Sequence, residues 1–148
     1  SPLNKFFLSY SAFEHNKLNS SAQEFQRLRR SCGWRRWDPE GDRAWADFRQ
    51  ALVKEFNWLF GTEPTDLLAW QTMCQFAGTI GKTDTCDNCY LALKSQNFSL
   101  VDLIDTRRRG TGVVQVFGSK ESLSEYIKET ASYFPRNHPK AGNLLRKL

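Results

Sequence analysis

Residues 27–38, RLRRSCGWRRWD, carry five arginines and two tryptophans around one glycine. Guanidinium groups bind phosphate or carboxylate through paired hydrogen bonds, and an exposed indole can stack on a base. The alternative is structural: Trp34 and Trp37 close the corner between two helices and pack against the core. We predict the structural role, so replacing a well-buried one of them by alanine costs about 3–5 kcal/mol. Arg35 and Arg36 are then expected to stay solvated and open to a partner.

Basic side chains form three candidate partner-binding patches. They are Arg27, Arg29, Arg30, Arg35 and Arg36; then Arg107, Arg108 and Arg109; and then Arg136 and Lys140, followed by Arg146 and Lys147. Part of this charge has a local explanation, because cations complement the negative C-terminal end of a helix. The net charge of +5 favours anionic partners through long-range attraction. Patches that merge on one face would indicate nucleic-acid binding, and scattered patches would indicate a protein partner.

The motif GTIGKT at residues 78–83 ends like a phosphate-binding P-loop. Such a loop has a glycine five residues before the position of Gly81, where this chain has Phe76, and it follows a β-strand. The residues before the motif have helical periodicity instead. We therefore predict a glycine-containing turn between two helices and no nucleotide site.

Cys86 and Cys89 have the spacing of a zinc or redox pair. A structural zinc site needs four ligands, and Cys74 falls on an inward helix face. A thioredoxin-type pair needs a βαβ context that the sequence lacks. Packing is therefore the predicted role, with no metal or other cofactor. The four cysteines, Cys32, Cys74, Cys86 and Cys89, are too few and too widely spaced in the sequence for a disulfide scaffold. They therefore indicate a reducing intracellular compartment.

His15 and His138 lie in polar segments far apart in the sequence, and no nucleophile motif accompanies them. Acidic residues are dispersed and form no general acid–base pair. We therefore predict that the chain is not an enzyme.

The sequence contains two Asn-x-Ser glycosylation sequons, at Asn19 and Asn97. We interpret both as chance occurrences, because their serines, Ser21 and Ser99, are better explained as helix caps.

Helical periodicity and capping residues predict the elements that position these side chains. The expected helices span residues 21–33, 39–61, 65–78, 82–96, 99–110 and 119–134, with a further turn or two within 140–148. Residues 113–117, VVQVF, are the only β-like run and predict at most one strand or an extended connector. The expected fold is all-α: one compact domain over residues 1–148 with six or seven helices, of which the one over 39–61 is central.

The same pattern predicts helix caps and inward faces. Predicted N-caps are Ser21, Thr65 and Ser99, with Pro39 in a first turn, and predicted C-caps are Gly33, Gly61 and Gly78. The predicted inward residues of the first helix, over 21–33, are Phe25, Leu28 and Cys32. The helix over 39–61 has an apolar stripe of Trp45, Phe48, Leu52, Phe56 and Leu59, and Trp58 and Phe60 make this stripe wider. The inward residues of the helix over 65–78 are Leu67, Trp70, Cys74 and Ala77, and those of the helix over 119–134 are Leu123, Tyr126, Ile127 and Phe134.

Aromatic residues make up 14% of the 148 residues, which predicts an ordered core rather than a disordered chain. No apolar run reaches the ~18–20 residues of a membrane span. The first segment, SPLNKFFLSY, has no character of a signal peptide and is interpreted as a domain boundary in a longer protein.

Three segments together resemble a helical domain found in uncharacterised proteins of filamentous fungi. They are EFNWLFG at residues 55–61, LLAWQTMCQFAG at 67–78 and FPRNHPKAGNLLRKL at 134–148, after the turn rich in arginine and tryptophan. The resemblance covers nearly the full length and rests on core and turn positions. It implies an intracellular domain within a larger protein, and it brings no activity, cofactor or catalytic residue.

We therefore expect a non-enzymatic helical adaptor domain of an intracellular protein, nuclear or cytoplasmic. Its expected partner is a protein of acidic character, because the candidate contact residues are basic. Nucleic-acid binding through the arginine-rich patches is the alternative, and no membrane association is expected.

Overall fold

The computed structural model describes residues 1–148 and contains eight α-helices that hold 59% of the residues. They are α1 (Pro2–Leu8), α2 (Ser21–Cys32), α3 (Pro39–Phe60), α4 (Leu67–Ala77), α5 (Cys86–Lys94), α6 (Leu100–Arg109), α7 (Lys120–Thr130) and α8 (Asn143–Lys147). The all-α prediction is therefore confirmed. The β-like run at 113–117 forms no strand, and its Phe117 makes a single antiparallel bridge with Asn97. No helix combines the length and the apolar character that a bilayer crossing requires.

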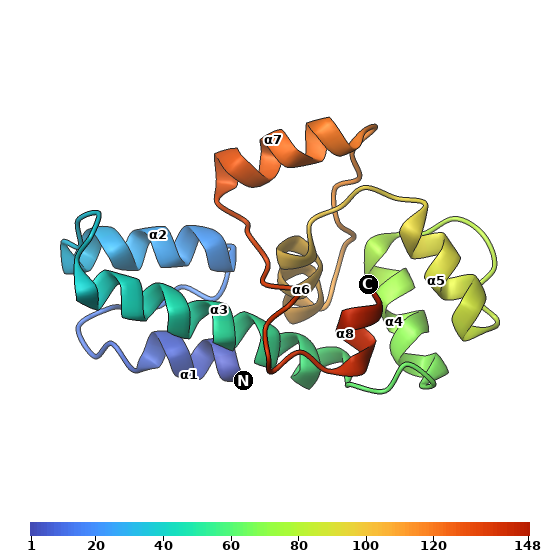
Figure 1. The fold of residues 1–148 in the computed structure, drawn as a ribbon, viewed down its shortest axis with the longest axis horizontal. Helices are drawn as coiled ribbons and strands as arrows, with labels where there is room; N and C mark the ends of the chain where they lie inside the picture. The colour runs from blue at the N-terminus through green and yellow to red at the C-terminus, as the bar shows by residue number, and fades with distance from the viewer.

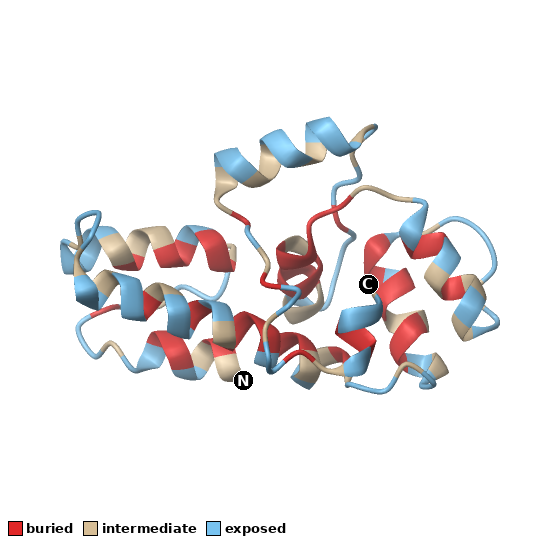
Figure 2. Ribbon diagram, in the orientation of Figure 1, coloured by how far each residue is buried: buried red, intermediate tan, exposed pale blue.

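The helices are arranged around α3, which runs along the long axis of the molecule (Figure 1). α1 and α2 flank its N-terminal half, α4, α5 and α8 gather near its C-terminal end, and α6 lies between the two groups. Buried residues line the facing sides of these helices (Figure 2). The helix predicted over 39–61 is therefore central, as expected.

α1 is the helix that the sequence pattern did not indicate, and it raises the helix count one above the predicted range. A helix of seven residues is marginal by itself, since nucleating the first turn is unfavourable. Here the Ser1 hydroxyl caps the N-terminus, while Leu3, Phe6 and Phe7 bury against the aromatic core around Phe48. Tertiary packing therefore makes this segment helical.

Most predicted helix ends are correct within two residues, but the helix predicted from residue 82 begins at Cys86 and the helix predicted to residue 134 ends at Thr130. Two N-caps shift by one residue. Ser99, Gly33, Gly61 and Gly78 are confirmed as caps. The cap of α2 is Ser20, whose hydroxyl accepts a hydrogen bond from the Gln23 amide, and the predicted cap Ser21 lies inside the helix. The cap of α4 is Asp66 rather than Thr65. Neighbouring polar residues compete for the cap position, and the local pattern does not decide between them.

Trp58 is the main error in the predicted core. Phe48, Leu52 and Phe56 are fully buried, whereas Trp58 is 65% exposed. Each helical residue turns by about 100°, so Trp58 points about 200° away from Phe56, two residues earlier. Cys32, predicted to point inward at the end of α2, is exposed as well. The inward residues of α4 are confirmed: Trp70, Cys74 and Ala77 are buried and Leu67 is half-buried.

α7 stands apart from the other helices and contains no buried residue (Figure 2). The predicted inward residues Leu123, Tyr126 and Ile127 are only half-buried. The helix is held through Tyr126, whose hydroxyl donates to Asp102 Oδ2 at 2.6 Å and whose ring lies against Phe117. The 3.6-residue period therefore located the helix but overstated its burial and its length: Ala131, with φ 54°, ends α7 before the predicted inward residue Phe134, which is partly buried in the following loop.

Two buried carboxylates hold the N-termini of α1 and α2. Glu55 Oε1 on α3 accepts from the Leu3 amide at 2.9 Å. Asp105 on α6 accepts from the Ser21 amide at 3.2 Å and 3.1 Å through its two oxygens. Negative charge at these positions also complements the positive end of each helix. The two carboxylates therefore fix where α1 and α2 begin relative to α3 and α6.

Arg108 lies between these carboxylates and joins them. Its Nε is 3.5 Å from Glu55 Oε2, one terminal nitrogen is 3.7 Å from Asp105 Oδ1, and the other donates to Asn4 Oδ1 at 2.8 Å. Burial nevertheless raises the pKa of Asp105 from 3.8 to about 6. The Asp105 carboxyl group therefore binds its proton more tightly in the folded chain than in the unfolded chain. Its contribution to the free energy of unfolding falls as the pH rises from 3.8 to about 6.

Candidate functional site

The three predicted basic patches lie in different parts of the molecule. The first is at the turn between α2 and α3, at one end of the long axis, and the third surrounds α8 in the opposite half (Figure 1). The second is at the C-terminal end of α6, which lies between them. The first and third patches therefore lie in opposite halves of the molecule.

Two of the predicted partner-binding arginines are committed to internal contacts. Arg27 Nε donates to Glu24 Oε1 at 2.8 Å, its terminal nitrogen donates to the Glu14 carbonyl, and its guanidinium lies 4.4 Å from the centre of the Phe13 ring. Arg108 is only 11% exposed within the network described above. Each of the two is therefore held inside the fold by a buried carboxylate, although the Arg27 side chain stays 39% exposed.

The other candidates outside the first patch differ from one another in their surroundings. Arg107 is half-buried, with its guanidinium 5.5 Å from the centre of the Phe76 ring, and Arg109 is exposed. Arg136 donates to the Leu148 carbonyl at 3.1 Å. Lys140, Arg146, Lys147 and Arg30 are exposed. None of these side chains lines the pocket between α2 and α3.

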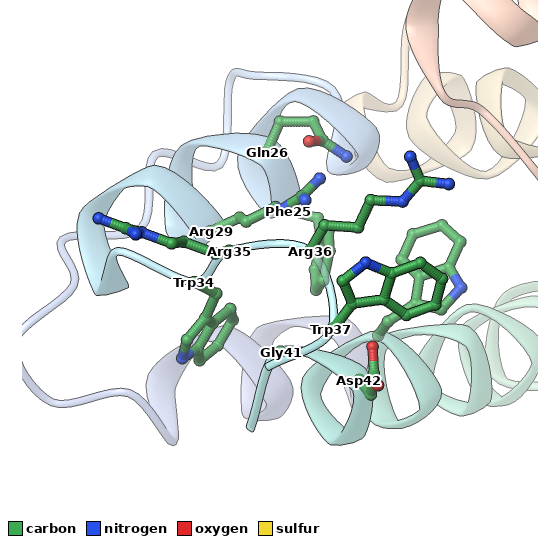
Figure 3. Close-up of a pocket in the computed structure, with 10 residues that line it drawn as sticks. Phe25, Gln26, Arg29, Trp34, Arg35, Arg36, Trp37, Gly41 and Asp42 are labelled. Atoms are coloured by element: carbon green, nitrogen blue, oxygen red, sulfur yellow. The ribbon is translucent and has the colours of Figure 1, made fainter. Parts of the chain in front are cut away.

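The structure does bring Arg29, Arg35 and Arg36 together, around a pocket at the turn between α2 and α3 (Figure 3). The arginine–carboxylate ion pairs of the chain involve only Arg27 and Arg108, so these three guanidinium groups have none. The pocket has a volume of about 280 Å³. We call this site the α2–α3 corner, defined by Phe25, Arg29, Trp34, Arg35, Arg36, Trp37 and Trp45.

Trp37 is exposed and adopts an unusual backbone conformation, so its predicted burial is wrong. Its φ is 79° and 78% of the residue is exposed. The reason lies in the turn: Asp38 precedes Pro39 and is therefore extended, and its carboxylate accepts from the Arg35 amide at 2.6 Å. The chain reverses at Trp37 to close this turn. The Arg36 guanidinium lies 5.1 Å from the centre of the outward ring.

Trp34 has the structural role that the sequence predicted for both tryptophans. It is half-buried and packs against the core, with its ring edge-to-face against Tyr10 at 5.6 Å. Gly41 permits this approach, since a Cβ at that position would lie 3.1 Å from Trp34 Cβ. The corner therefore has one tryptophan anchored in the fold and one presented to solvent.

We expect Trp34→Ala to lower the free energy of unfolding by about 2 kcal/mol, less than the ~3–5 kcal/mol of a fully buried aromatic residue. Trp37→Ala should change it by less than about 0.5 kcal/mol, because the ring is exposed. Trp37→Gly should be at least as stable as the parent, since glycine adopts a positive φ without steric strain. Thermal melts of the three variants measure these differences. A Trp37→Ala variant that melts as early as Trp34→Ala would contradict the exposed placement of Trp37.

Glu24 is a buried charged residue whose partners the sequence did not reveal. Its carboxylate accepts from Arg27, from the Asn16 amide at 2.8 Å and from Asn19 Nδ2 at 2.8 Å, and it lies 2.7 Å from His15 Nδ1. Burial by itself would raise the pKa of Glu24, but these hydrogen bonds outweigh it and lower the pKa to about 2. Glu24 lies three residues after the predicted cap Ser21, the spacing of a capping box, which predicts that its side chain accepts from the amide of the cap residue. In the structure it organises the loop before α2 instead.

His15 belongs to this buried cluster. Its ring stacks on Phe7 at 4.3 Å, and burial lowers its pKa. The imidazole is therefore neutral near pH 7, and its Nδ1–H donates to Glu24. Its Nε2 is buried without a hydrogen-bond partner.

Cys74, Cys86 and Cys89 pack at the core as predicted, and the glycine-rich turn joins two helices. Cys74 and Cys89 are buried, and Cys86 is half-buried. Burial raises the pKa of Cys89 to about 12, which keeps it a thiol. No three His, Cys, Asp or Glu side chains come together in a way that could hold a metal ion. GTIGKT at 78–83 connects α4 to α5, and the element before it is a helix rather than the strand of a P-loop.

No family model, curated protein or solved structure matches this chain. The resemblance to helical domains of filamentous fungi stays a prediction. The geometry and charge of the α2–α3 corner are therefore the features that indicate a function.

Proposed function

We propose that the chain is a non-enzymatic interaction module that binds an acidic segment of a protein partner at the α2–α3 corner. The observation that carries this proposal is an exposed Trp37 beside three guanidinium groups without ion pairs. Arginine binds carboxylates through two parallel hydrogen bonds. Tryptophan and arginine are also the residue types that most often dominate the binding energy of protein interfaces.

The distribution of positive charge favours a protein partner over a nucleic acid. Modules that bind single strands combine a positive groove along the backbone with several stacking aromatic residues. Here the basic patches lie apart, and Arg27 and Arg108 are used inside the fold. The corner offers one exposed ring, that of Trp37. A short segment of a protein that contacts a single site fits this arrangement better than a nucleic-acid strand that runs along a groove.

The lining of the pocket favours binding over catalysis. Asp42 is the only acidic residue of the lining, which includes no histidine, cysteine or hydroxyl side chain. General acid–base catalysis needs a positioned proton donor or acceptor, and nucleophilic catalysis needs an activated nucleophile. We propose an intracellular setting, nuclear or cytoplasmic, because all four cysteines are free thiols, as is usual in a reducing compartment.

Peptide binding by a charge-reduced variant tests this function. We expect labelled glutamate-rich peptides that carry one central apolar residue to bind the wild-type chain in a fluorescence anisotropy titration. Replacing Arg29, Arg35 and Arg36 together by alanine should weaken this binding at least about tenfold, because the bidentate contacts to carboxylates are lost.

The matched control removes the same charge elsewhere. Arg49, Arg109 and Lys140 are exposed and lie outside the corner, so their triple alanine variant should keep the affinity within about threefold. Equal weakening by the two triple variants would indicate unspecific charge attraction and reject the proposal. A mixed-sequence single-stranded oligonucleotide that binds the corner more tightly than every acidic peptide would support the nucleic-acid alternative instead.

A further inference from the structure

We infer that the bound acidic segment places one aromatic side chain in the pocket of the α2–α3 corner, an inference that rests on the proposed function. The pocket volume of about 280 Å³ lies at the lower end of the ~300–1,000 Å³ typical of ligand sites. That volume suits one large side chain. The rest of the segment would then lie over the surface around the opening.

The walls of the pocket favour an aromatic anchor over an aliphatic one. Phe25, Trp34, Trp37 and Trp45 all line it. Aromatic pairs gain stability from offset and edge-to-face contacts beyond the area they bury. A phenylalanine among these rings therefore gains more than a leucine of similar size.

The charges around the opening specify where the acidic residues of the segment lie. Arg35 and Arg36 extend in opposite directions from the turn between α2 and α3 (Figure 3). Carboxylates on both sides of the anchor can therefore each reach a guanidinium group. The recognised pattern is an aromatic residue between acidic residues, rather than an acidic run that follows an apolar one.

Trp37 is the residue that distinguishes this pocket from an ordinary surface hollow. Non-glycine residues with positive φ are strained and concentrate at ligand clamps and other functional sites. Its ring is a wall of the pocket and is 78% exposed, so an anchor that contacts it removes apolar area from water. The affinity for an aromatic anchor therefore depends on Trp37, and the affinity for the acidic flanks depends on the arginines.

Two labelled peptides that differ only in the central residue separate these contributions. Both carry glutamates on each side, with phenylalanine at the centre of one and alanine at the centre of the other. We expect wild-type protein to bind the phenylalanine peptide about ten- to a hundredfold more tightly, the effect of burying one such side chain. Trp37→Ala should reduce this preference to less than about threefold without changing the melting temperature. Trp58→Ala, which removes an exposed tryptophan far along α3, should leave the preference intact.

Each result has one meaning. Equal affinity of wild-type protein for the two peptides overturns the anchor, and the proposed function survives if both peptides still depend on Arg29, Arg35 and Arg36. A preference for phenylalanine that persists in Trp37→Ala shows that Trp37 does not hold the anchor and also overturns the inference. Absence of binding to both peptides rejects the proposed function and the anchor with it.

Discussion

Arg108→Ala is expected to lower the free energy of unfolding by about 3–5 kcal/mol, the cost of breaking a buried ion pair from one side. The substitution leaves the carboxylates of Glu55 and Asp105 buried without their common cation. It also removes the hydrogen bond to Asn4 that ties α6 to α1. Urea denaturation measures this loss, which is a large part of the total stability of ~5–15 kcal/mol of a typical domain.

Arg109 provides the matched control for this prediction. It is the adjacent residue of the same helix and is exposed, so Arg109→Ala should change stability by less than about 0.5 kcal/mol. Adding Glu55→Gln to Arg108→Ala should recover part of the loss, because one uncompensated charge is removed and the glutamine oxygen can still accept from the Leu3 amide. Equal denaturation midpoints for the two single arginine variants would contradict the buried network.

Glu24→Gln is expected to lower the free energy of unfolding by about 3 kcal/mol at pH 7, from a pKa shift of 4.5 to about 2. The carboxylate is fully buried and is the acceptor for Arg27, Asn19 and the Asn16 amide. Glutamine keeps the size of the side chain and loses both the charge and one acceptor oxygen. The loop before α2 should therefore lose its attachment to the helix.

The effect of Glu24 depends on pH in a defined direction. A carboxyl group with a lower pKa in the folded chain binds its proton less readily there than in the unfolded chain. Its stabilising contribution is therefore complete above pH 4.5 and is lost as pH falls to about 2. Denaturation curves of wild type and Glu24→Gln should differ at neutral pH and converge in strong acid. Glu121→Gln, the same change at an exposed glutamate on α7, should follow wild type throughout. If the difference in free energy of unfolding between wild type and Glu24→Gln did not change with pH, the charge of Glu24 would not be its cause.

The helices were predictable because their signals are local. A run such as residues 99–110 contains its own cap at Ser99, its own 3.6-residue period and its own terminal Gly110. These signals act between neighbours in the chain and need no tertiary partner. α1 escaped prediction for the same reason, since its helical state depends on contacts with α3 and not on its own short sequence.

The roles of single charged residues were not predictable from the pattern. Residues 107–109 are three consecutive arginines, yet Arg107 lies against an aromatic ring, Arg108 is buried between carboxylates and Arg109 is in solvent. The partners that separate them come from α1, α3 and α4. One signal was present: Glu55 occupies an inward helical position, three residues after the buried Leu52. A carboxylate at such a position needs a buried partner, but its identity cannot be deduced from spacing.

By itself, the sequence determined the all-α class, the central helix over 39–61 and a basic turn containing two tryptophans between Gly33 and Pro39. These features follow from periodicity and from the restricted backbones of glycine and proline, which act over a few residues. Only the tertiary structure decided that Trp34 packs against Tyr10 while Trp37 faces solvent. The two residues have the same chemistry and lie in one short connection. Their exposure depends on how that connection closes and on the residues that lie beneath it, Tyr10 in the turn after α1 and Gly41 in α3.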